Sequence, residues 1–185
     1  MNSIKQIEVI YNNRLVGRLA LTREGLCAFE YSAEWLSSGF SISPFELPLR
    51  SGVFIAKPRP FEGGFGVFDD CLPDGWGLLI LDRYLQQKGI NPCTLTLLDR
   101  LALVGSTGRG ALEFRPDNSV VTRQDFADFE KLALEAEKIL ASDDYMGEGI
   151  EEFQDRGGSP GGARPKIFVR YNNKEWLVKF RAKRD

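Results

Sequence analysis

The sequence predicts an α+β fold, in which a mainly antiparallel N-terminal subdomain with two or three helices is followed by a further pair of strands near the C-terminus. Two hairpin patterns support this prediction. Apolar and polar residues alternate on both sides of Asn12-Asn13 and again on both sides of Asn172-Asn173. Asparagine tolerates the positive φ angles that a tight two-residue turn requires.

Two helices are predicted between the hairpins. Residues 73–89 carry apolar side chains at helical spacing and reach Gly89, and residues 91–105 do the same and reach Gly105. Glycine adopts the left-handed conformation in which many helices end, so each glycine is read as a terminator.

The remaining segments give weaker signals. Residues 26–36 resemble a further strand, and residues 41–55 hold two prolines among apolar residues, which is typical of extended edge structure. A third helix is predicted over 122–141 from a capping pattern that starts at Thr122. Its expected apolar stripe is Phe126, Phe129, Ala133, Ala136 and Leu140. Residues 143–149 are polar and are expected to form a connection.

The composition excludes several classes of protein. The 185 residues contain no histidine and carry a formal net charge of −2, which excludes Ser-His-Asp and Cys-His catalysis and gives no electrostatic reason for direct binding to nucleic acid. Cys27, Cys71 and Cys93 are widely spaced, which favours core residues in a reducing cytoplasm over disulfides or a thiolate metal site. No run approaches eighteen apolar residues, so we expect no contact with a membrane.

Charge is divided unevenly near the C-terminus. Residues 123–156 hold eleven acidic and four basic side chains, whereas residues 157–185 hold two acidic and eight basic ones. The basic part begins with GGSPGGARPK at 157–166, where glycine and proline oppose both helix and sheet. Backbone N–H groups in a glycine-rich loop can point at an anion, so this loop is a candidate phosphate-binding segment.

A strand lysine follows the loop. Alternation places Trp176, Val178 and Phe180 on one face of the last strand and Lys179 on the other. A glycine-rich loop joined to a strand lysine holds the nucleotide phosphates in protein kinases. The candidate phosphate-binding residues are Gly161, Gly162, Ala163, Lys166 and Lys179. By spacing alone, a lysine on a solvated edge strand fits Lys179 equally well.

Several segments resemble the HipA-type toxin kinases of type II toxin–antitoxin systems. SPGGARPK at 159–166 is similar to the S-x-x-G-A-x-x-K loop of that family. The upstream segments that match, in the order of the family, are FEYSAEWL, SPFELPLR, FDDCLPDGWG, LLDRLALVG and GRGALEF. These segments extend over most of residues 9–180, and the ordered set is specific where no single piece is.

The resemblance implies roles for individual residues. Ser159 would match the serine that HipA-type kinases phosphorylate on themselves, which expels the loop and silences the enzyme. Gly162 and Ala163 would match the loop backbone near the ATP phosphates, and Lys179 the strand lysine that contacts them. The implied cofactors are ATP and Mg²⁺, the implied partner is a HipB-like helix-turn-helix antitoxin, and the implied substrate is an aminoacyl-tRNA synthetase.

The resemblance also implies a division of the chain. Residues 1–115 would form the HipA N-terminal subdomain, residues 116–156 a helix and an acidic linker, and residues 157–185 an incomplete kinase-like N-lobe. No catalytic-loop or metal-binding sequence follows Lys179, so no catalytic residue and no metal ligand is assigned. We therefore expect the N-terminal region of a HipA-like serine/threonine kinase that is inactive without a separate catalytic lobe.

Two other interpretations stay open. The chain could be a stand-alone interaction module, in which residues 1–115 bind a kinase core or a helix-turn-helix antitoxin. The loop and hairpin of residues 157–185 count against this interpretation, because a binding module does not need them. The chain could also be a degenerate remnant without function.

Overall fold

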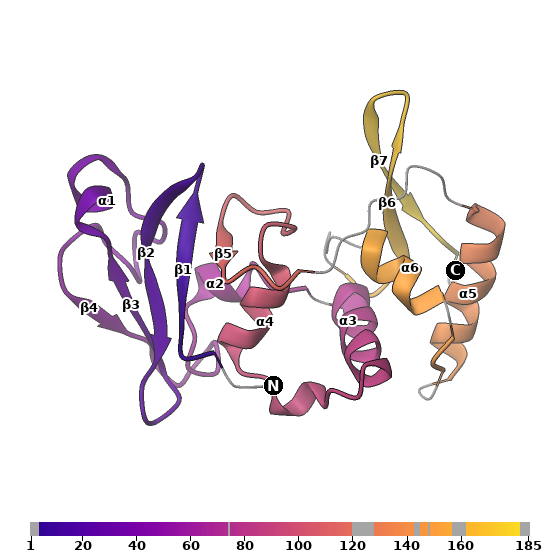
Figure 1. The fold of residues 1–185 in the computed structure, drawn as a ribbon, viewed down its shortest axis with the longest axis horizontal. Helices are drawn as coiled ribbons and strands as arrows, with labels where there is room; N and C mark the ends of the chain where they lie inside the picture. The colour runs from indigo at the N-terminus through magenta and orange to yellow at the C-terminus, as the bar shows by residue number, and fades with distance from the viewer. Residues whose placement is uncertain are drawn as a thin grey trace. The chain divides into compact units, whose positions relative to one another are not determined.

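The computed structural model describes residues 4–73, 75–119, 128–142, 145–147, 149–156 and 162–181. The chain forms two units (Figure 1). The first comprises Met1–Leu72 with Leu95–Ser119, and the second comprises Pro73–Thr94 with Val120–Asp185. Within the described ranges, no helix combines the length and the apolar character that crossing a bilayer requires.

The first unit is built on a five-stranded sheet. Its strands lie in the order β4-β3-β2-β1-β5, and all neighbouring strands are antiparallel. The strands are β1 Gln6–Tyr11, β2 Arg14–Leu21, β3 Cys27–Tyr31, β4 Val53–Ile55 and β5 Glu113–Arg115. The predicted α+β class with an antiparallel N-terminal sheet is therefore confirmed.

The turn between β1 and β2 follows the prediction from its asparagines. Asn12 has a φ of 47° and Asn13 a φ of 61°, which is the left-handed region that a tight hairpin turn requires and that asparagine reaches at low cost. The register of the first two strands thus rests on local turn chemistry.

Only the first half of the segment predicted as a strand, residues 26–36, forms one. β3 ends at Tyr31, and helix α1 (Ala33–Ser38) begins immediately after it. The hydroxyl of Ser32 accepts a hydrogen bond from the amide of Trp35 at 3.1 Å. This N-cap satisfies one of the amides that a helix start leaves without an intrahelical partner, so a local cap overrides the alternating pattern.

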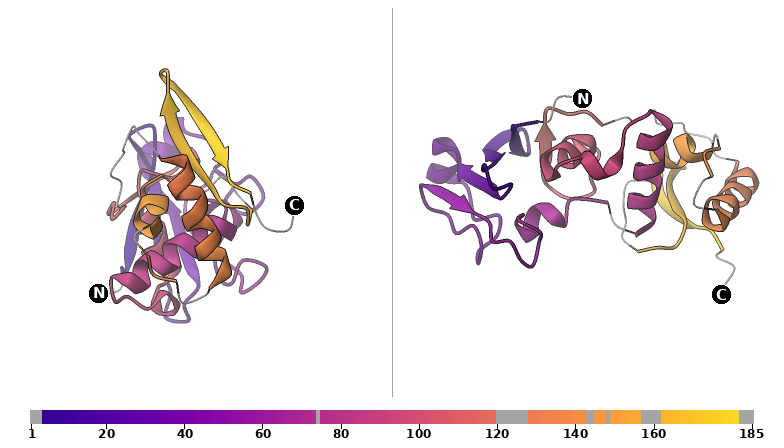
Figure 2. Two further views of the ribbon diagram at one scale, coloured as in Figure 1. Left: turned by 90° about the vertical axis from the view of Figure 1, so that its right-hand side faces the viewer. Right: turned by 90° about the horizontal axis from the view of Figure 1, so that it is seen from below.

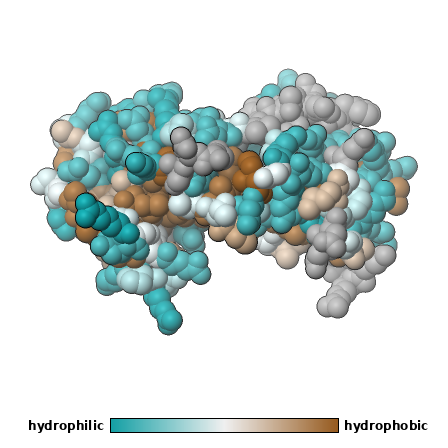
Figure 3. Space-filling model, turned by 60° about the horizontal axis from the view of Figure 1, so that its bottom comes forward, coloured by the Kyte–Doolittle hydropathy of each residue, from teal (hydrophilic) through white to brown (hydrophobic). Residues whose placement is uncertain are grey.

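Helices α2 (Gly66–Asp69) and α4 (Leu97–Val104) complete the core of the first unit. Its fully buried side chains include Ile7, Leu19, Phe29, Trp35, Leu47, Phe68, Leu98, Leu101 and Phe114. On the face shown in Figure 3, apolar residues also reach the surface of this unit between hydrophilic side chains.

A buried carboxylate joins the N-terminal segment to α4. Asp99, 3% exposed, accepts hydrogen bonds from the amide of Ile4 at 2.9 Å and from the amide and hydroxyl of Thr96 at 3.0 and 2.7 Å. Thr96 and Asp99 form a capping box at the start of α4. Desolvation raises the pKa of Asp99, but the hydrogen bonds outweigh it and hold the pKa below its ordinary value.

The second unit combines helices with a separate hairpin. Its helices are α3 (Gly75–Gln87), α5 (Phe129–Ala141) and α6 (Gly149–Arg156), with a short 3-10 turn at Pro92–Thr94. Strands β6 (Lys166–Tyr171) and β7 (Lys174–Lys179) pair with each other, and their turn is again an asparagine pair with positive φ. Figure 2 shows this hairpin beside α5 and α6.

One apolar cluster holds the second unit together. It includes Trp76 and Ile80 of α3, Leu132 and Ile139 of α5, Ile150 and Phe153 of α6, and Ile167 and Phe180 of the hairpin region. The buried guanidinium of Arg83 donates to the carbonyl of Ile139 at 2.6 Å, near the C-terminal end of α5. A cation at that position compensates carbonyl groups that the helix leaves without a partner.

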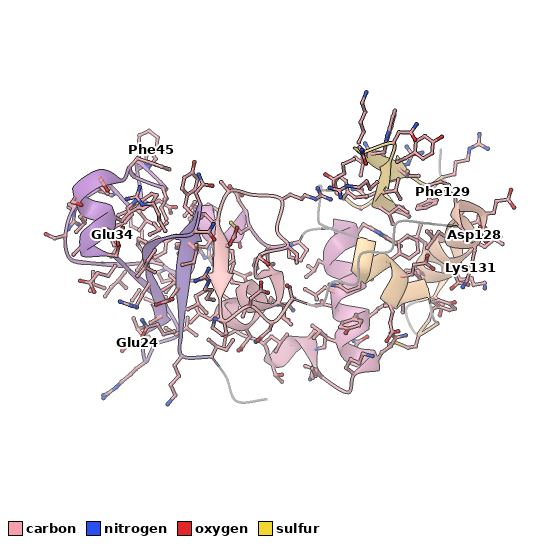
Figure 4. The ribbon with its side chains drawn as sticks, turned by 45° about the horizontal axis from the view of Figure 1, so that its top comes forward. Glu24, Glu34, Phe45, Asp128, Phe129 and Lys131 are labelled. Atoms are coloured by element: carbon pink, nitrogen blue, oxygen red, sulfur yellow. The ribbon has the colours of Figure 1, made fainter. Side chains whose placement is uncertain are left out.

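The predictions for residues 122–156 need two corrections. α5 is described from Asp128, whose side chain caps it by accepting from the amide of Lys131 at 3.0 Å (Figure 4), and the predicted start at Thr122 lies outside the described residues. The predicted apolar stripe is wrong in part, since Phe129 and Leu140 are exposed, and its Phe126 lies outside the described residues. The buried side chains are Leu132, Glu135, Ala136 and Ile139. Glu135 is tolerated there because Lys138 and Tyr145 donate hydrogen bonds to it.

The second correction concerns the predicted acidic linker. Residues 149–156 form α6, whose Ile150 and Phe153 are fully buried. Two apolar residues three positions apart are too few to stand out in a sequence, but they suffice to bury one face of a two-turn helix.

The division of the chain into two units differs from the expected division at residue 115. Residues 73–94 lie within the expected N-terminal subdomain, yet they belong to the second unit. The physical reason is that Trp76 and Ile80 of α3 are buried in the second cluster.

Replacing Asp99 by alanine should lower the free energy of unfolding of the first unit by about 1–2 kcal/mol, because the change removes a helix cap and leaves partly buried donors without acceptors. Urea unfolding at pH 7 would measure this loss. Glu24→Ala, at an exposed turn (Figure 4), is the matched control and should change stability little.

The contribution of Asp99 should also depend on pH. Its folded pKa lies below the ordinary value, so the stability that it supplies is present at neutral pH and is lost as the pH falls through the folded pKa. The difference in free energy of unfolding between wild type and Asp99→Asn should therefore decrease from pH 7 towards about pH 3. A difference independent of pH would contradict this assignment.

Candidate functional site

The hairpin of the second unit places two predicted lysines opposite each other. In the β6–β7 register, Lys166 is the direct partner of Lys179, and Ile167 is the direct partner of Val178. Directly opposed residues of antiparallel strands project from the same face. Ile167 and Val178 lie in or against the apolar cluster, so both lysines project from the face that the cluster does not occupy.

The outer end of the hairpin follows the predicted alternation only in part. Val178 and Phe180 pack in the apolar cluster as predicted, whereas Trp176 is 52% exposed. Figure 1 shows the reason, since the turn of the hairpin extends beyond the helices that cover its base. Lys179 is exposed and is therefore accessible to a ligand on the open face.

Lys166 differs sharply from Lys179 in its surroundings. It is 4% exposed, and its Nζ donates a hydrogen bond to the carbonyl oxygen of Gly162 at 2.8 Å. A buried ammonium group needs such acceptors because losing its hydration is costly. The lysine at the end of the glycine-rich loop is thus hydrogen-bonded to the loop itself.

The lysine pair has an electrostatic consequence. Like charges at directly opposed positions of an antiparallel pair are destabilising, and burial of Lys166 reduces the screening that water would give. An anion on the open face could contact the ammonium group of Lys179, which is exposed, and the buried charge of Lys166 would add to the positive potential there. The arrangement is therefore suited to a phosphate or another compact anion.

The loop exit is fixed to the hairpin by further hydrogen bonds. The amide of Phe180 donates to the carbonyl of Pro165 at 2.9 Å, and Nε of Arg164 donates to the carbonyl of Phe180 at 3.0 Å. The carbonyl of Gly162 also accepts from the amide of Trp76 at 3.1 Å. These contacts give the end of the loop a defined position relative to the lysines.

The structure places four of the five predicted phosphate-binding residues together. Gly162 and Lys166 are hydrogen-bonded, and Lys166 pairs with Lys179 across the strands. Ala163 is exposed and adjoins Gly162. Gly161 and the predicted phosphorylation site Ser159 lie outside the described residues.

Nothing in the sequence indicated that the start of α3 contacts the glycine-rich loop. Gly75 and Trp76 lie beside Gly162, 86 or more positions away in the chain, and the pattern around them indicated only a helix start. Among the described residues, no group of three or more Cys, Asp or Glu side chains could hold a metal ion.

A comparison with protein families relates the N-terminal part of the chain to one known family. The family described as HipA N-terminal domain matches residues 7–115. A search of curated proteins found no match.

A solved structure extends the similarity in fold. HipA of Shewanella oneidensis MR-1, determined in a complex with HipB and operator DNA, superposes with a TM-score of 0.54 over 92% of this chain at 22% sequence identity. The chain covers 37% of the length of that protein. At this identity the superposition establishes similarity of fold. The family match, which extends over more than half of the chain, shows that this protein belongs to the HipA N-terminal domain family.

Proposed function

We propose that this chain is the N-terminal region of a HipA-like serine/threonine protein kinase toxin, and that it contains the phosphate-binding part of an ATP site. The observation that supports this proposal is the register of Lys166 against Lys179 beside Gly162. The family match and the similarity in fold to HipA agree with it.

The residues present fit the phosphate part of ATP. Lys179 is exposed on the open face of the hairpin and would donate to phosphate oxygens, as a strand lysine does in kinases. Lys166 would add positive charge to the same face while holding the loop through Gly162. ATP, when bound, supplies the phosphoryl group that a kinase transfers.

We further propose that the 185-residue chain does not transfer phosphate by itself. Transfer requires a residue that positions the nucleophile and ligands for Mg²⁺, and the sequence after Lys179 contains no catalytic-loop pattern. Those groups would come from residues outside these 185, since the chain covers 37% of the length of the HipA structure that it resembles.

The partners are proposed by analogy with HipA. HipA of Shewanella oneidensis assembles with HipB and operator DNA, so we propose a HipB-like helix-turn-helix antitoxin as partner in a toxin–antitoxin system. An aminoacyl-tRNA synthetase is the proposed substrate of the complete kinase.

Mg-ATP should bind the isolated chain with a Kd no lower than about 1 mM, because half of the contacts of a complete site are missing. NMR titration would show shifts at Gly162, Ala163 and Lys179. Lys179→Ala should abolish these shifts, and Lys174→Ala, an exposed lysine of the same strand, should leave them intact. Equal binding by wild type and Lys179→Ala, or phosphotransfer by the purified chain, would refute the proposal.

Ser159 is proposed as a phosphorylation site. A phosphate there would carry nearly two negative charges and would be attracted to the basic residues that follow the loop. Incubation with an active full-length HipA-type kinase and ATP should add one phosphate, detectable by intact-mass measurement, and Ser159→Ala should prevent it. If Ser159→Ala gained as much phosphate as the wild type, Ser159 would not be the phosphorylation site.

A second candidate function, that of an interaction module, is favoured by one exposed side chain. Phe45 is 100% exposed and projects from the first unit (Figure 4). Its turn is nevertheless held firmly: Leu47 is fully buried and its carbonyl accepts from the hydroxyl of Tyr31 at 2.6 Å, and Glu46 accepts from the amide of Gly66 at 2.9 Å.

A rigid turn that presents an aromatic ring is suited to a binding anchor. Ordering the turn costs nothing further on association, and aromatic side chains dominate the energetics of many interfaces. The edge strand β4 adds exposed Val53 and Ile55 to the apolar surface of this unit. These residues fit the binding of a kinase core or an antitoxin.

Phe45→Ser should weaken binding of the neighbouring gene products, co-expressed and purified as candidate partners, by about 30-fold, which corresponds to loss of one hot-spot residue. Calorimetry would measure the affinity. The melting temperature should stay unchanged because the ring contributes nothing to the core. Phe129→Ser, which removes an exposed phenylalanine of the second unit, is the matched control, and equal affinity of both variants would argue against the anchor.

A further inference from the structure

The start of α3 and the end of the glycine-rich loop lie in close contact. An ideal Cβ at Gly75 would lie 2.6 Å from the carbonyl carbon of Gly162, 2.7 Å from its oxygen and 2.8 Å from the nitrogen of Ala163. Real Cβ atoms do not approach backbone this closely. Gly75 also has a φ of +46°, a conformation that favours glycine.

The same peptide is held by two donors. The carbonyl oxygen of Gly162 accepts from the amide of Trp76 at 3.1 Å and from Nζ of Lys166 at 2.8 Å. In a trans peptide the C=O and the following N–H point in opposite directions. The amide of Ala163 is therefore directed away from the acceptor side of its peptide, and the negative end of the peptide dipole is engaged by Trp76 and Lys166.

The donor on α3 has a rigid support. Trp76 is 2% exposed, and its ring packs edge to face on Phe153 at a centroid distance of 5.1 Å. Both belong to the apolar cluster that also buries Ile167 of β6. The helix start that contacts the loop and the strand that follows the loop are thus anchored in one core.

We propose that Gly75 and Trp76 are positioning residues for the anion site. Gly75 leaves the space that the Gly162–Ala163 peptide occupies, and the amide of Trp76, together with Nζ of Lys166, holds the carbonyl of Gly162 and so fixes the orientation of this peptide in the loop. This inference rests on the proposed function. It adds that Gly75 and Trp76 shape the phosphate-binding loop. Both residues lie within the segment that matches the HipA N-terminal domain, whereas the loop lies outside that segment.

The test compares Gly75→Ala with Gly89→Ala. Gly89 lies just beyond the other end of α3 with a φ of +72°, and a Cβ there would meet nothing within 4 Å. Both variants impose an alanine on a left-handed backbone, so they share the backbone strain. Only Gly75→Ala also displaces the loop.

The first readout needs no ligand. Amide hydrogen exchange should show protection of the Trp76 amide in the wild type, although it lies in the first turn of a helix, where amides lack intrahelical acceptors. Gly75→Ala should reduce this protection by roughly tenfold or more and shift the NMR signals of Gly162 and Ala163. Gly89→Ala should do neither. An unprotected Trp76 amide in the wild type, or unchanged loop signals in Gly75→Ala, would overturn the proposal.

The second readout is binding of Mg-ATP by NMR titration. Gly75→Ala should weaken it roughly fivefold or more, the effect of one misplaced hydrogen-bond donor, while Gly89→Ala should bind as the wild type does. Equal binding by Gly75→Ala and wild type would overturn the positioning role. Absence of binding by the wild type would refute the proposed function instead, and the exchange measurement would then decide the positioning role alone.

Discussion

Burial of one face of the β6–β7 hairpin is the constraint on which the candidate site depends. A two-stranded sheet is at best marginally stable in water, and this one is held by Ile167, Val178 and Phe180 packing with three helices. Because side chains alternate along a strand, burying these residues forces Lys166 and Lys179 to the opposite face. The charge arrangement of the site is thus a consequence of apolar packing.

The same packing explains why the helix at residues 75–87 belongs to the second unit. Its buried Trp76 lies in the apolar cluster of the hairpin, and the amide of Trp76 donates to the carbonyl of Gly162 in the loop. The match to the HipA N-terminal domain and the division into compact units therefore follow different boundaries. A match to a family is defined by consecutive residues of the sequence. A compact unit is defined by which buried side chains contact one another, and these can come from distant parts of the chain.

Local signals were the most reliable guide to the fold. The asparagine turns at 12–13 and 172–173 have the expected positive φ, and Gly89 and Gly105 follow their helices as expected. The helix predicted from residue 91 begins only at Leu97, because Thr96 caps it there. The errors arose where a short local cap or a sparse apolar pattern decided the outcome. Ser32 converts a strand-like run into a helix, and α6 forms from only two deeply buried residues.

The sequence by itself determined the asparagine turns, the antiparallel N-terminal sheet and the helices that end before Gly89 and Gly105, because these depend on φ preferences and on the period of apolar residues over a few positions. Only the tertiary structure decided that Lys166 is buried against Gly162 and that Gly75 and Trp76 support the loop, whereas the pairing of Lys166 with Lys179 follows from the local asparagine turn. The contact of Gly75 and Trp76 with Gly162 joins residues far apart in the chain, and the burial of Lys166 depends on the elements that pack around it. Their physical origin is the packing of side chains in a shared core, which no local pattern records.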